Sequence, residues 1–539
     1  MINIDGKVDI HFPMEMKPRP QQIDLLQKCK KTINNGKKYI LINAPTGSGK
    51  SYFAIMFSNW YKNYVDENAK IDIITNSKLL QEQYHDSFDF IRVLKGQSNY
   101  WCDDNKCNCQ EGKELNKLKD TKCPNCPYDM AKRAWMGSEM GITNFHMFNS
   151  FAMYQHKVIE DRNSNVLIID EAHDFESVFC DFLSTKLSGK LLKKYGMELV
   201  EIEFYEQKFV KITTIEKFMT FLEDDFLPKV RSLNSKYEHL IGDSSSQDEI
   251  KEYNKYYTYT STQIEKFERI LEKYDADPNN WSLDRVYNKE KNLELLIEPI
   301  WGYDYLNEYI WCNYDHVVFM SGSILDKVMF SYINGLKVEL TDYYELDSTF
   351  PLENRPIYYV KNIGKMTFES KELTFKNQIP VIEKILKKYE KENGIIHTIN
   401  YELAEWLKNN IPDSRLIFHE TENREDVFKN FKMNGVNSVL ISPSMMSGIS
   451  LDDDLSRFQI IMKVPYPNIS SNKIKSRQKT NKRWYDWKTC IDIIQMAGRS
   501  VRSETDWAHT FILDSCFSDI LKRTSFFPRW FTNSIKVLK

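Results

Sequence analysis

The segment Ala44-Pro-Thr-Gly-Ser-Gly-Lys50-Ser51 limits the possible folds of this chain more than any other feature of its sequence. An apolar run, residues 39–44, precedes it, and helical spacing follows Lys50, so strand, glycine-rich loop and helix are predicted. In such a loop the backbone N–H groups surround nucleotide phosphates, the lysine reaches the β and γ phosphates, and the serine hydroxyl binds Mg²⁺. We therefore predict a nucleotide-binding α/β domain whose contacts to ATP and Mg²⁺ come from Ala44, Pro45, Thr46, Gly47, Ser48, Gly49, Lys50 and Ser51.

A second apolar run, Val166 to Ile169, ends directly in the sequence Asp170-Glu171-Ala172-His173. Parallel strands place the residues that follow them at one edge of the sheet, so this acidic pair is expected to face the phosphate loop. Asp170 is predicted to bind Mg²⁺ through water, and Glu171 is predicted to polarise the attacking water. Both residues are therefore predicted to be catalytic, together with Lys50.

Apolar strands alternate with helical segments along most of the chain, which predicts two α/β domains with parallel sheets. Strands at 39–44, 71–75 and 166–169 outline the first sheet, and strands at 317–320, 394–398, 439–442, 460–464 and 510–513 outline the second. Residues 175–305 are rich in Lys, Glu, Tyr and Leu at helical spacing, which predicts a helical insert. The expected organisation is a first domain, 1–325, with inserts at 96–136 and 175–305, and a second domain, 326–539.

Near the end of the chain, Gln495-Met-Ala-Gly-Arg499-Ser-Val-Arg502 is predicted to lie on a helix. Two arginines three positions apart share a helical face, so both can stabilise charge on a transferred phosphoryl group. The ordinary alternative for such a pair is a solvated basic face. Small residues also follow two strands, at 321–323 and at 447–452, and the second loop is expected to sense the nucleotide through Gly448 and Asp452.

Five of the ten cysteines lie within a short window, at Cys102, Cys107, Cys109, Cys123 and Cys126. In a reducing compartment such a cluster indicates a metal site instead of disulfides. Four thiolates can hold zinc or a [4Fe-4S] cluster, and the spacing alone does not separate the two.

These motifs together resemble those of the XPD/DinG-like branch of superfamily 2 helicases. Residues 19–22, ending in Gln22, resemble the motif that contacts adenine, and residues 44–51, 75–83, 170–173, 320–325, 447–452 and 495–502 resemble motifs I, Ia, II, III, V and VI in turn. The resemblance implies two RecA-like domains, an iron-sulfur domain and a helical arch inserted in the first of them, and movement 5′ to 3′ along single-stranded DNA. Motif III departs from the usual pattern, with glycine and serine where alanine and threonine are typical, and motif V is loose.

The same resemblance favours a [4Fe-4S] cluster over zinc, because Gly96-Gln-Ser-Asn-Tyr100 before the first cysteine and Cys126-Pro-Tyr128 look like that iron-sulfur domain. It implies Cys102, Cys123 and Cys126 as ligands, with Cys109 preferred to Cys107 as the fourth. It also places Gln22, Gly448, Asp452 and Gln495 among the nucleotide contacts, and Arg499 and Arg502 among the catalytic residues.

The formal net charge of −3 does not indicate a polyanionic partner, so nucleic-acid contacts must come from local basic and aromatic groups. Two regions have that character, one with Tyr100, Trp101, Lys132, Arg133 and Trp135, the other with Lys482, Arg483, Trp484, Tyr485 and Trp487. The expected partners are single-stranded DNA and forked or tailed duplexes, and single-strand-binding or replication proteins. No apolar run reaches the about 20 residues of a membrane span, so we expect a cytoplasmic monomer in a bacterial or phage-infected cell, with a nuclear location as the alternative.

The leading hypothesis is an ATP-dependent 5′ to 3′ DNA helicase. Its alternatives are a translocase that removes bound proteins or RNA:DNA hybrids, and a non-hydrolysing nucleic-acid-binding scaffold. Intact residues at all the predicted catalytic positions argue against the scaffold. A nuclease ranks lowest, because no domain-sized length of chain remains for one.

Overall fold

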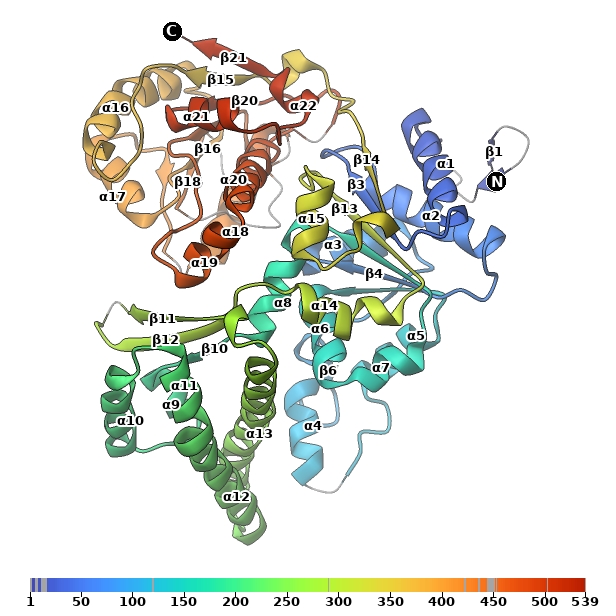
Figure 1. Cartoon of the computed structure of the whole chain (residues 1–539), viewed down its shortest axis with the longest axis vertical. Helices are drawn as coiled ribbons and strands as arrows, with labels where there is room; N and C mark the ends of the chain where they lie inside the picture. The colour runs from blue at the N-terminus through green and yellow to red at the C-terminus, as the bar shows by residue number, and fades with distance from the viewer. Residues whose placement is uncertain are drawn as a thin grey trace.

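The computed structural model describes residues 2–4, 8–10, 17–118, 121–288, 290–420, 423–434, 437–443, 451, 453–501 and 503–538. Two α/β domains, each built around a seven-stranded parallel sheet, lie side by side, and an elongated α+β extension projects from the first (Figure 1). A short antiparallel pair near the N-terminus, β1 (Ile2–Ile4) and β2 (Val8–Ile10), stands apart from both sheets. The predicted fold class, two parallel-sheet domains with inserts in the first, is confirmed.

The first sheet consists of buried apolar strands covered by helices on both faces, as parallel sheets require. Its order is β14 (Thr341–Glu345), β3 (Tyr39–Asn43), β13 (His316–Ser321), β9 (Val166–Asp170), β4 (Ile71–Thr75), β8 (Met140–Asn144) and β5 (Arg92–Val93). The helices of this domain are α1 (Pro20–Asn34), α2 (Lys50–Tyr64), α3 (Lys78–Ser87), α6 (Phe145–Tyr154), α7 (His156–Arg162), α8 (Phe175–Leu183), α14 (Tyr303–Tyr309) and α15 (Lys327–Ile333).

Two expectations about this sheet need correction. The strand expected at 317–320 belongs to the first sheet and not to the second, because β13 pairs with both β3 and β9. The chain also remains in the first sheet beyond residue 325, because β14 pairs in parallel with β3 over Thr341–Glu345. The connection between the two domains therefore follows Glu345.

The second sheet has the order β17 (Leu416–Ile417), β18 (Val439–Ser442), β16 (Gly394–His397), β19 (Phe458–Ile461), β20 (His509–Ile512), β15 (Ile357–Val360) and β21 (Ile535–Leu538). Its helices are α16 (Lys371–Lys388), α17 (Tyr401–Asn410), α18 (Arg424–Asn434), α19 (Asn472–Thr480), α20 (Lys482–Ala497), α21 (Cys516–Arg523) and α22 (Arg529–Thr532). Helix α20 runs along the boundary with the first domain (Figure 1).

The cysteine-rich insert leaves the first domain after β5. It contains the short hairpin β6 (Trp101–Cys102) and β7 (Cys107–Asn108), then α4 (Cys109–Leu118) and α5 (Pro127–Gly137). Helix α5 leads back to β8. A buried ion pair of 2.5 Å between Arg162 Nε and Asp72 Oδ1 stabilises the sheet beside the end of α5. Arg162 also donates to the carbonyl of Trp135 at the end of α5.

The second insert is only partly the helical extension that was expected. Its far end is a hairpin of long helices, α12 (Leu227–Asp243) and α13 (Gln247–Ala276), preceded by α9 (Gly189–Lys194), α10 (Leu199–Lys211) and α11 (Ile215–Phe221). Its base is a three-stranded antiparallel sheet of β10 (Thr185–Leu187), β12 (Leu293–Pro299) and β11 (Trp281–Tyr287). We refer to residues 185–299 as the arch. Helix α13 of the arch contacts α4 of the cysteine-rich insert (Figure 1).

Among the described helices, none combines the length and the apolar character that crossing a bilayer needs.

Candidate nucleotide and nucleic-acid sites

The phosphate loop lies between β3 and α2, as predicted. Gly47 and Gly49 have φ angles of 75° and 80°, in the left-handed region that favours glycine. A Cβ on Gly47 would overlap the ring of Phe350, which comes from the connection between the two domains. The loop therefore requires glycine at this position for both conformation and space.

The first turn of α1 fastens the loop from its outer side. Gln22 Nε2 donates to the carbonyl of Gly49 at 3.0 Å, and Gln22 Oε1 accepts from the backbone N–H of Arg19 at 2.8 Å. The Arg19 guanidinium donates to the carbonyl of Gly47. Gln22 thus contacts the loop itself, at the position where the sequence motif predicted a nucleotide contact.

The acidic pair lies opposite Lys50. Lys50 Nζ is 3.9 Å from Glu171 Oε1 and 3.4 Å from the carbonyl of Ala44. Asp170 is buried at the end of β9, and burial, reinforced by the charge of Glu171 and opposed by Lys50, raises its pKa to about 6. A divalent cation beside this carboxyl would favour its charged form.

Tyr84 on α3 joins the two predicted magnesium ligands. Its hydroxyl donates to Asp170 Oδ2 at 3.1 Å and is also hydrogen-bonded to Ser51. The ring is fully buried, and burial raises the pKa of Tyr84 well above its ordinary value. Sequence reasoning missed Tyr84, because a tyrosine inside an ordinary helix gives no signal.

A chain of polar contacts connects the acidic pair to the second domain. His173 Nδ1 lies 3.4 Å from Glu171 Oε2 and is hydrogen-bonded to Ser321 Oγ at 2.8 Å. Ser321 Oγ is 3.3 Å from Ser323 Oγ, which accepts from Gln495 Nε2 at 2.7 Å. Because Gln495 lies on α20, the path crosses from one domain to the other.

Arg499 follows α20 directly and is buried at the same interface. Its charge contributes with burial to lowering the pKa of His397 to about 3, and it is among the groups whose charge lowers the pKa of Asp174 against the effect of burial. Arg499 therefore lies close to the end of β16 and to the residues that follow the acidic pair. The predicted Arg502, Gly448 and Asp452, with the loop at 447–450, lie outside the described residues.

A small cavity of about 50 Å³ lies between the phosphate loop and the second domain. Its lining includes Pro45 and Thr46 from the loop, Phe350 and Arg355 from the connection between the domains, and Gly498 from the end of α20. The Arg355 guanidinium donates to the carbonyl of Trp530 at 2.7 Å and to Ser534 Oγ at 2.6 Å. Both domains thus contribute to the surroundings of the phosphates.

Four of the five clustered cysteines form two contacting pairs. Cys102 contacts Cys123, and Cys109 contacts Cys126 and lies within electrostatic range of Cys102. Cys107 belongs to neither pair. Their thiolate chemistry fits a four-cysteine cluster, although among the residues that the structure describes no three metal-binding side chains converge on one point.

The predicted strand-binding regions are corrected in part. Trp135 has no exposed surface and stacks on the Arg162 guanidinium, so it belongs to the core. Trp484 and Trp487 are also buried, and Trp487 Nε1 donates to the carbonyl of Ile324 in the first domain at 2.9 Å. Aromatic residues beside cations pack inward as readily as they face solvent, so the sequence did not separate the two.

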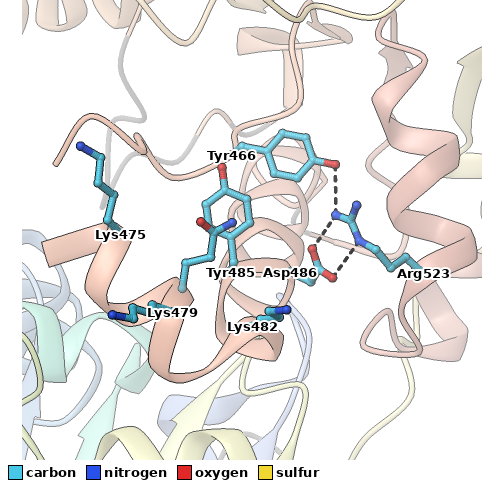
Figure 2. Close-up of a pocket in the computed structure, with 8 residues that line it drawn as sticks. Tyr466, Lys475, Lys479, Lys482, Tyr485, Asp486 and Arg523 are labelled. Carbon is cyan, nitrogen blue, oxygen red and sulfur yellow. Dashed lines mark hydrogen bonds and ion pairs between the residues drawn. The ribbon is translucent and has the colours of Figure 1, made fainter. Parts of the chain in front are cut away.

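Other members of these regions are accessible. Trp101 is 58% exposed at the cysteine hairpin, and Arg133 is exposed on α5. Near α20, a pocket of about 540 Å³ is lined by Tyr466, Lys475, Gln478, Lys479, Lys482, Tyr485, Asp486 and Arg523. Figure 2 shows Arg523 held by Asp486 beside the stacked rings of Tyr466 and Tyr485, whose centroids are 5.6 Å apart. Lys475, Lys479 and Lys482 have no carboxylate partner in the described part of the chain.

The sequence is similar to those of known helicases. Residues 382–534 match the helicase C-terminal domain family, and residues 15–194 match the family of the type III restriction enzyme res subunit. The chain is 22% identical to a probable ATP-dependent helicase of Methanocaldococcus jannaschii, over 96% of this chain and 94% of that protein. It is 20% identical to the ATP-dependent DNA helicase XPD of Sulfolobus acidocaldarius, over 92% of this chain and 96% of that protein.

Solved structures resemble the whole chain. An XPD helicase structure superposes with a TM-score of 0.63 at 15% identity and covers 97% of this chain and 100% of its own. An Xpd structure from S. tokodaii gives a TM-score of 0.59, also at 15% identity, with 97% and 100% coverage. At this level of sequence identity, the two similarities show a shared fold.

Proposed function

We propose that this chain, which belongs to the XPD/DinG-like branch of the superfamily 2 helicases, is an ATP-dependent DNA helicase that moves 5′ to 3′ along single-stranded DNA. The observation that supports the proposal is the path of polar contacts from Glu171 through His173, Ser321 and Ser323 to Gln495. Hydrolysis releases the charged γ-phosphate beside Glu171 at one end of this path, and the other end lies on the second domain. The path therefore links the chemical step to the relative position of the domains.

Each site residue has its own role in ATP hydrolysis. Lys50 neutralises the β and γ phosphates, and the half-buried Glu171 beside it orients the attacking water. Ser51 and Asp170 hold Mg²⁺, which when bound offsets phosphate charge, and Tyr84 fixes both ligands. Gln495 and Arg499 approach from the second domain and complete the site when the domains close; Arg502, Gly448 and Asp452 remain proposed contacts.

The pocket beside α20 is the proposed contact for the single strand on the second domain. Lys475, Lys479 and Lys482, which have no carboxylate partner among the described residues, suit phosphate groups, and the half-buried Tyr485 offers an aromatic surface to a base. On the first domain, Arg133 offers a cation to a phosphate group and Trp101 offers an aromatic ring to a base. Any single-stranded nucleic acid could bind these two surfaces, and the similarity to DNA helicases supports DNA as the proposed strand.

The cysteine-rich insert is proposed to hold a [4Fe-4S] cluster through Cys102, Cys109, Cys123 and Cys126. The pairing of Cys109 with Cys126 supports Cys109 over Cys107 as the fourth ligand. The cluster, when bound, would brace an insert whose described elements are short: a 3-10 turn, a hairpin of two-residue strands and two helices of 10 and 11 residues.

The test uses protein purified without oxygen and duplexes with a matched single-stranded tail at either the 5′ or the 3′ end. ATP-dependent opening of the 5′-tailed duplex alone, abolished by Lys50→Ala, is the expected result. Opening of the 3′-tailed duplex would refute the polarity. Hydrolysis stimulated by DNA without any strand separation would replace the helicase by a translocase that clears proteins or hybrids.

A further inference from the structure

Helix α19 of the second domain presents two chemically different faces. Lys475 and Lys479 line the basic pocket described above. Lys473 and Arg477, also four residues apart, lie on the opposite side, and both are buried. Buried cations need partners, and within the described residues the main-chain and carboxylate partners of Lys473 and Arg477 all lie outside the second domain.

The N-terminal end of α19 holds the base of the arch. The backbone N–H of Asn472 donates to Asp284 Oδ1 at 2.7 Å, and Asn472 Nδ2 donates to the carbonyl of Leu283 at 2.7 Å, both on β11. Lys473 Nζ forms an ion pair of 2.8 Å with Glu298 on β12, and the two residues are 8% and 9% exposed. In Figure 1, α19 lies directly over these two strands.

Arg477 connects three parts of the molecule. Its Nε donates to the carbonyl of Ile300, just beyond the arch, and its Nη2 pairs with Glu176 Oε1 at 2.6 Å. The guanidinium lies between Trp301 and Trp484, 4.7 Å and 5.1 Å from the ring centroids. Glu176 belongs to α8, the helix that begins just after the catalytic acidic pair, and it also accepts from the backbone N–H of Gly302 at 3.0 Å.

The arch is thus joined to the first domain by chain connections and by contacts of α13 and β12 with α6, α8 and α14, and to the second domain by buried polar contacts. Breaking such contacts leaves buried charges unpaired, which is strongly unfavourable. We propose that α19 is a latch through which the arch follows the second domain when ATP draws the two motor domains together. This inference rests on the proposed motor function. If the arch moves with the second domain, the contact between α13 and α4 changes in each cycle of ATP hydrolysis. Lys475 and Lys479, on α19, hold the single-stranded DNA during this movement.

The test measures distances in the full chain with fluorescent dyes on non-natural amino acids. The labelling positions are exposed: Ser245 at the far end of the arch, Lys408 on α17 and Lys30 on α1. We expect a non-hydrolysable ATP analogue to change the distance from Ser245 to Lys30 and to leave the distance from Ser245 to Lys408 unchanged. The reverse pattern, or no change in either distance, would overturn the proposal.

Variants of the Lys473–Glu298 pair connect the latch to activity. Lys473→Glu is expected to make the distance from Ser245 to Lys408 sensitive to nucleotide and to lower strand separation per ATP hydrolysed by about five-fold. The added Glu298→Lys should restore both readouts. The matched control, Lys186→Glu, breaks an ion pair with Glu294 inside the arch sheet and should alter neither.

Different results would refute the latch and the proposed helicase function. An unchanged ratio of unwinding to hydrolysis in Lys473→Glu, with wild-type thermal stability, would overturn the latch. If the wild-type chain bound ATP but separated no strands, the proposed function would fail, while the distances would still decide whether the arch follows the second domain.

Discussion

The hydrogen bond between Ser323 and Gln495 offers a direct way to test the coupling between the domains. Ser323 is fully buried, and its hydroxyl accepts from Gln495 Nε2 at 2.7 Å. Removing one partner of a buried hydrogen bond leaves the other unsatisfied, at a cost of about 1–3 kcal/mol. If that bond forms only when the domains close on ATP, each of Ser323→Ala and Gln495→Ala should slow DNA-stimulated ATP hydrolysis by roughly 5- to 150-fold.

The double variant makes this prediction quantitative. Since both single changes remove the same bond, Ser323→Ala with Gln495→Ala should be about as slow as the slower single variant. The coupling energy of the cycle should then be about 1 kcal/mol or more, measured from kcat at saturating DNA. Losses that simply add would show that the two residues act independently, and the proposed path between the domains would be refuted. The intrinsic fluorescence of the folded variants serves as the structural control.

Three further predictions concern single groups. Tyr84→Phe removes the hydroxyl that donates to Asp170 and contacts Ser51, so the Mg²⁺ concentration at half-maximal ATPase should rise about three- to ten-fold; an unchanged Mg²⁺ dependence would exclude this role. Cys107→Ala should retain full iron and sulfide content after anaerobic purification, and Cys109→Ala should lose most of it; equal losses would contradict the pairing of Cys109 with Cys126. Burial and the charge of Arg499 lower the pKa of His397 to about 3, so the folded state binds fewer protons there than the unfolded state. Its stabilising contribution is complete above the ordinary histidine pKa and is lost as the pH falls toward 3, so His397→Gln should flatten the decline of urea stability over that range; an unaltered decline would assign it to other groups.

The parts of the structure that the sequence predicted are those with a strict local pattern. The phosphate loop and the acidic pair each follow an apolar strand, and period and spacing place them without any long-range information. The strands at 71–75, 394–398 and 439–442 were found for the same reason, because buried parallel strands are short continuous apolar runs.

The missed features depend on contacts between distant segments. Strand β14, with Asp342, Tyr343 and Tyr344, is amphipathic and lies at a sheet edge, so only its pairing with β3 reveals it. The antiparallel base of the arch was missed because the composition of 175–305 predicted helices throughout; β11 and β12 form a local hairpin, and only β10 joins the sheet from a distant part of the chain. Trp135 and Trp487 belong to regions predicted to bind nucleic acid because of their basic neighbours, with a core position as the alternative for each single residue, and the packing of α5 and α20 shows that both rings face inward.

Directed movement powered by ATP is the central claim of this account, and displacement of streptavidin from biotinylated single strands measures it most directly. Biotin is placed at either the 3′ or the 5′ end of the same oligonucleotide, and the release of streptavidin is followed with ATP and with the Lys50→Ala variant. The account predicts ATP-dependent acceleration of release from the 3′ end only. Equal acceleration at both ends, or acceleration at the 5′ end alone, would contradict it.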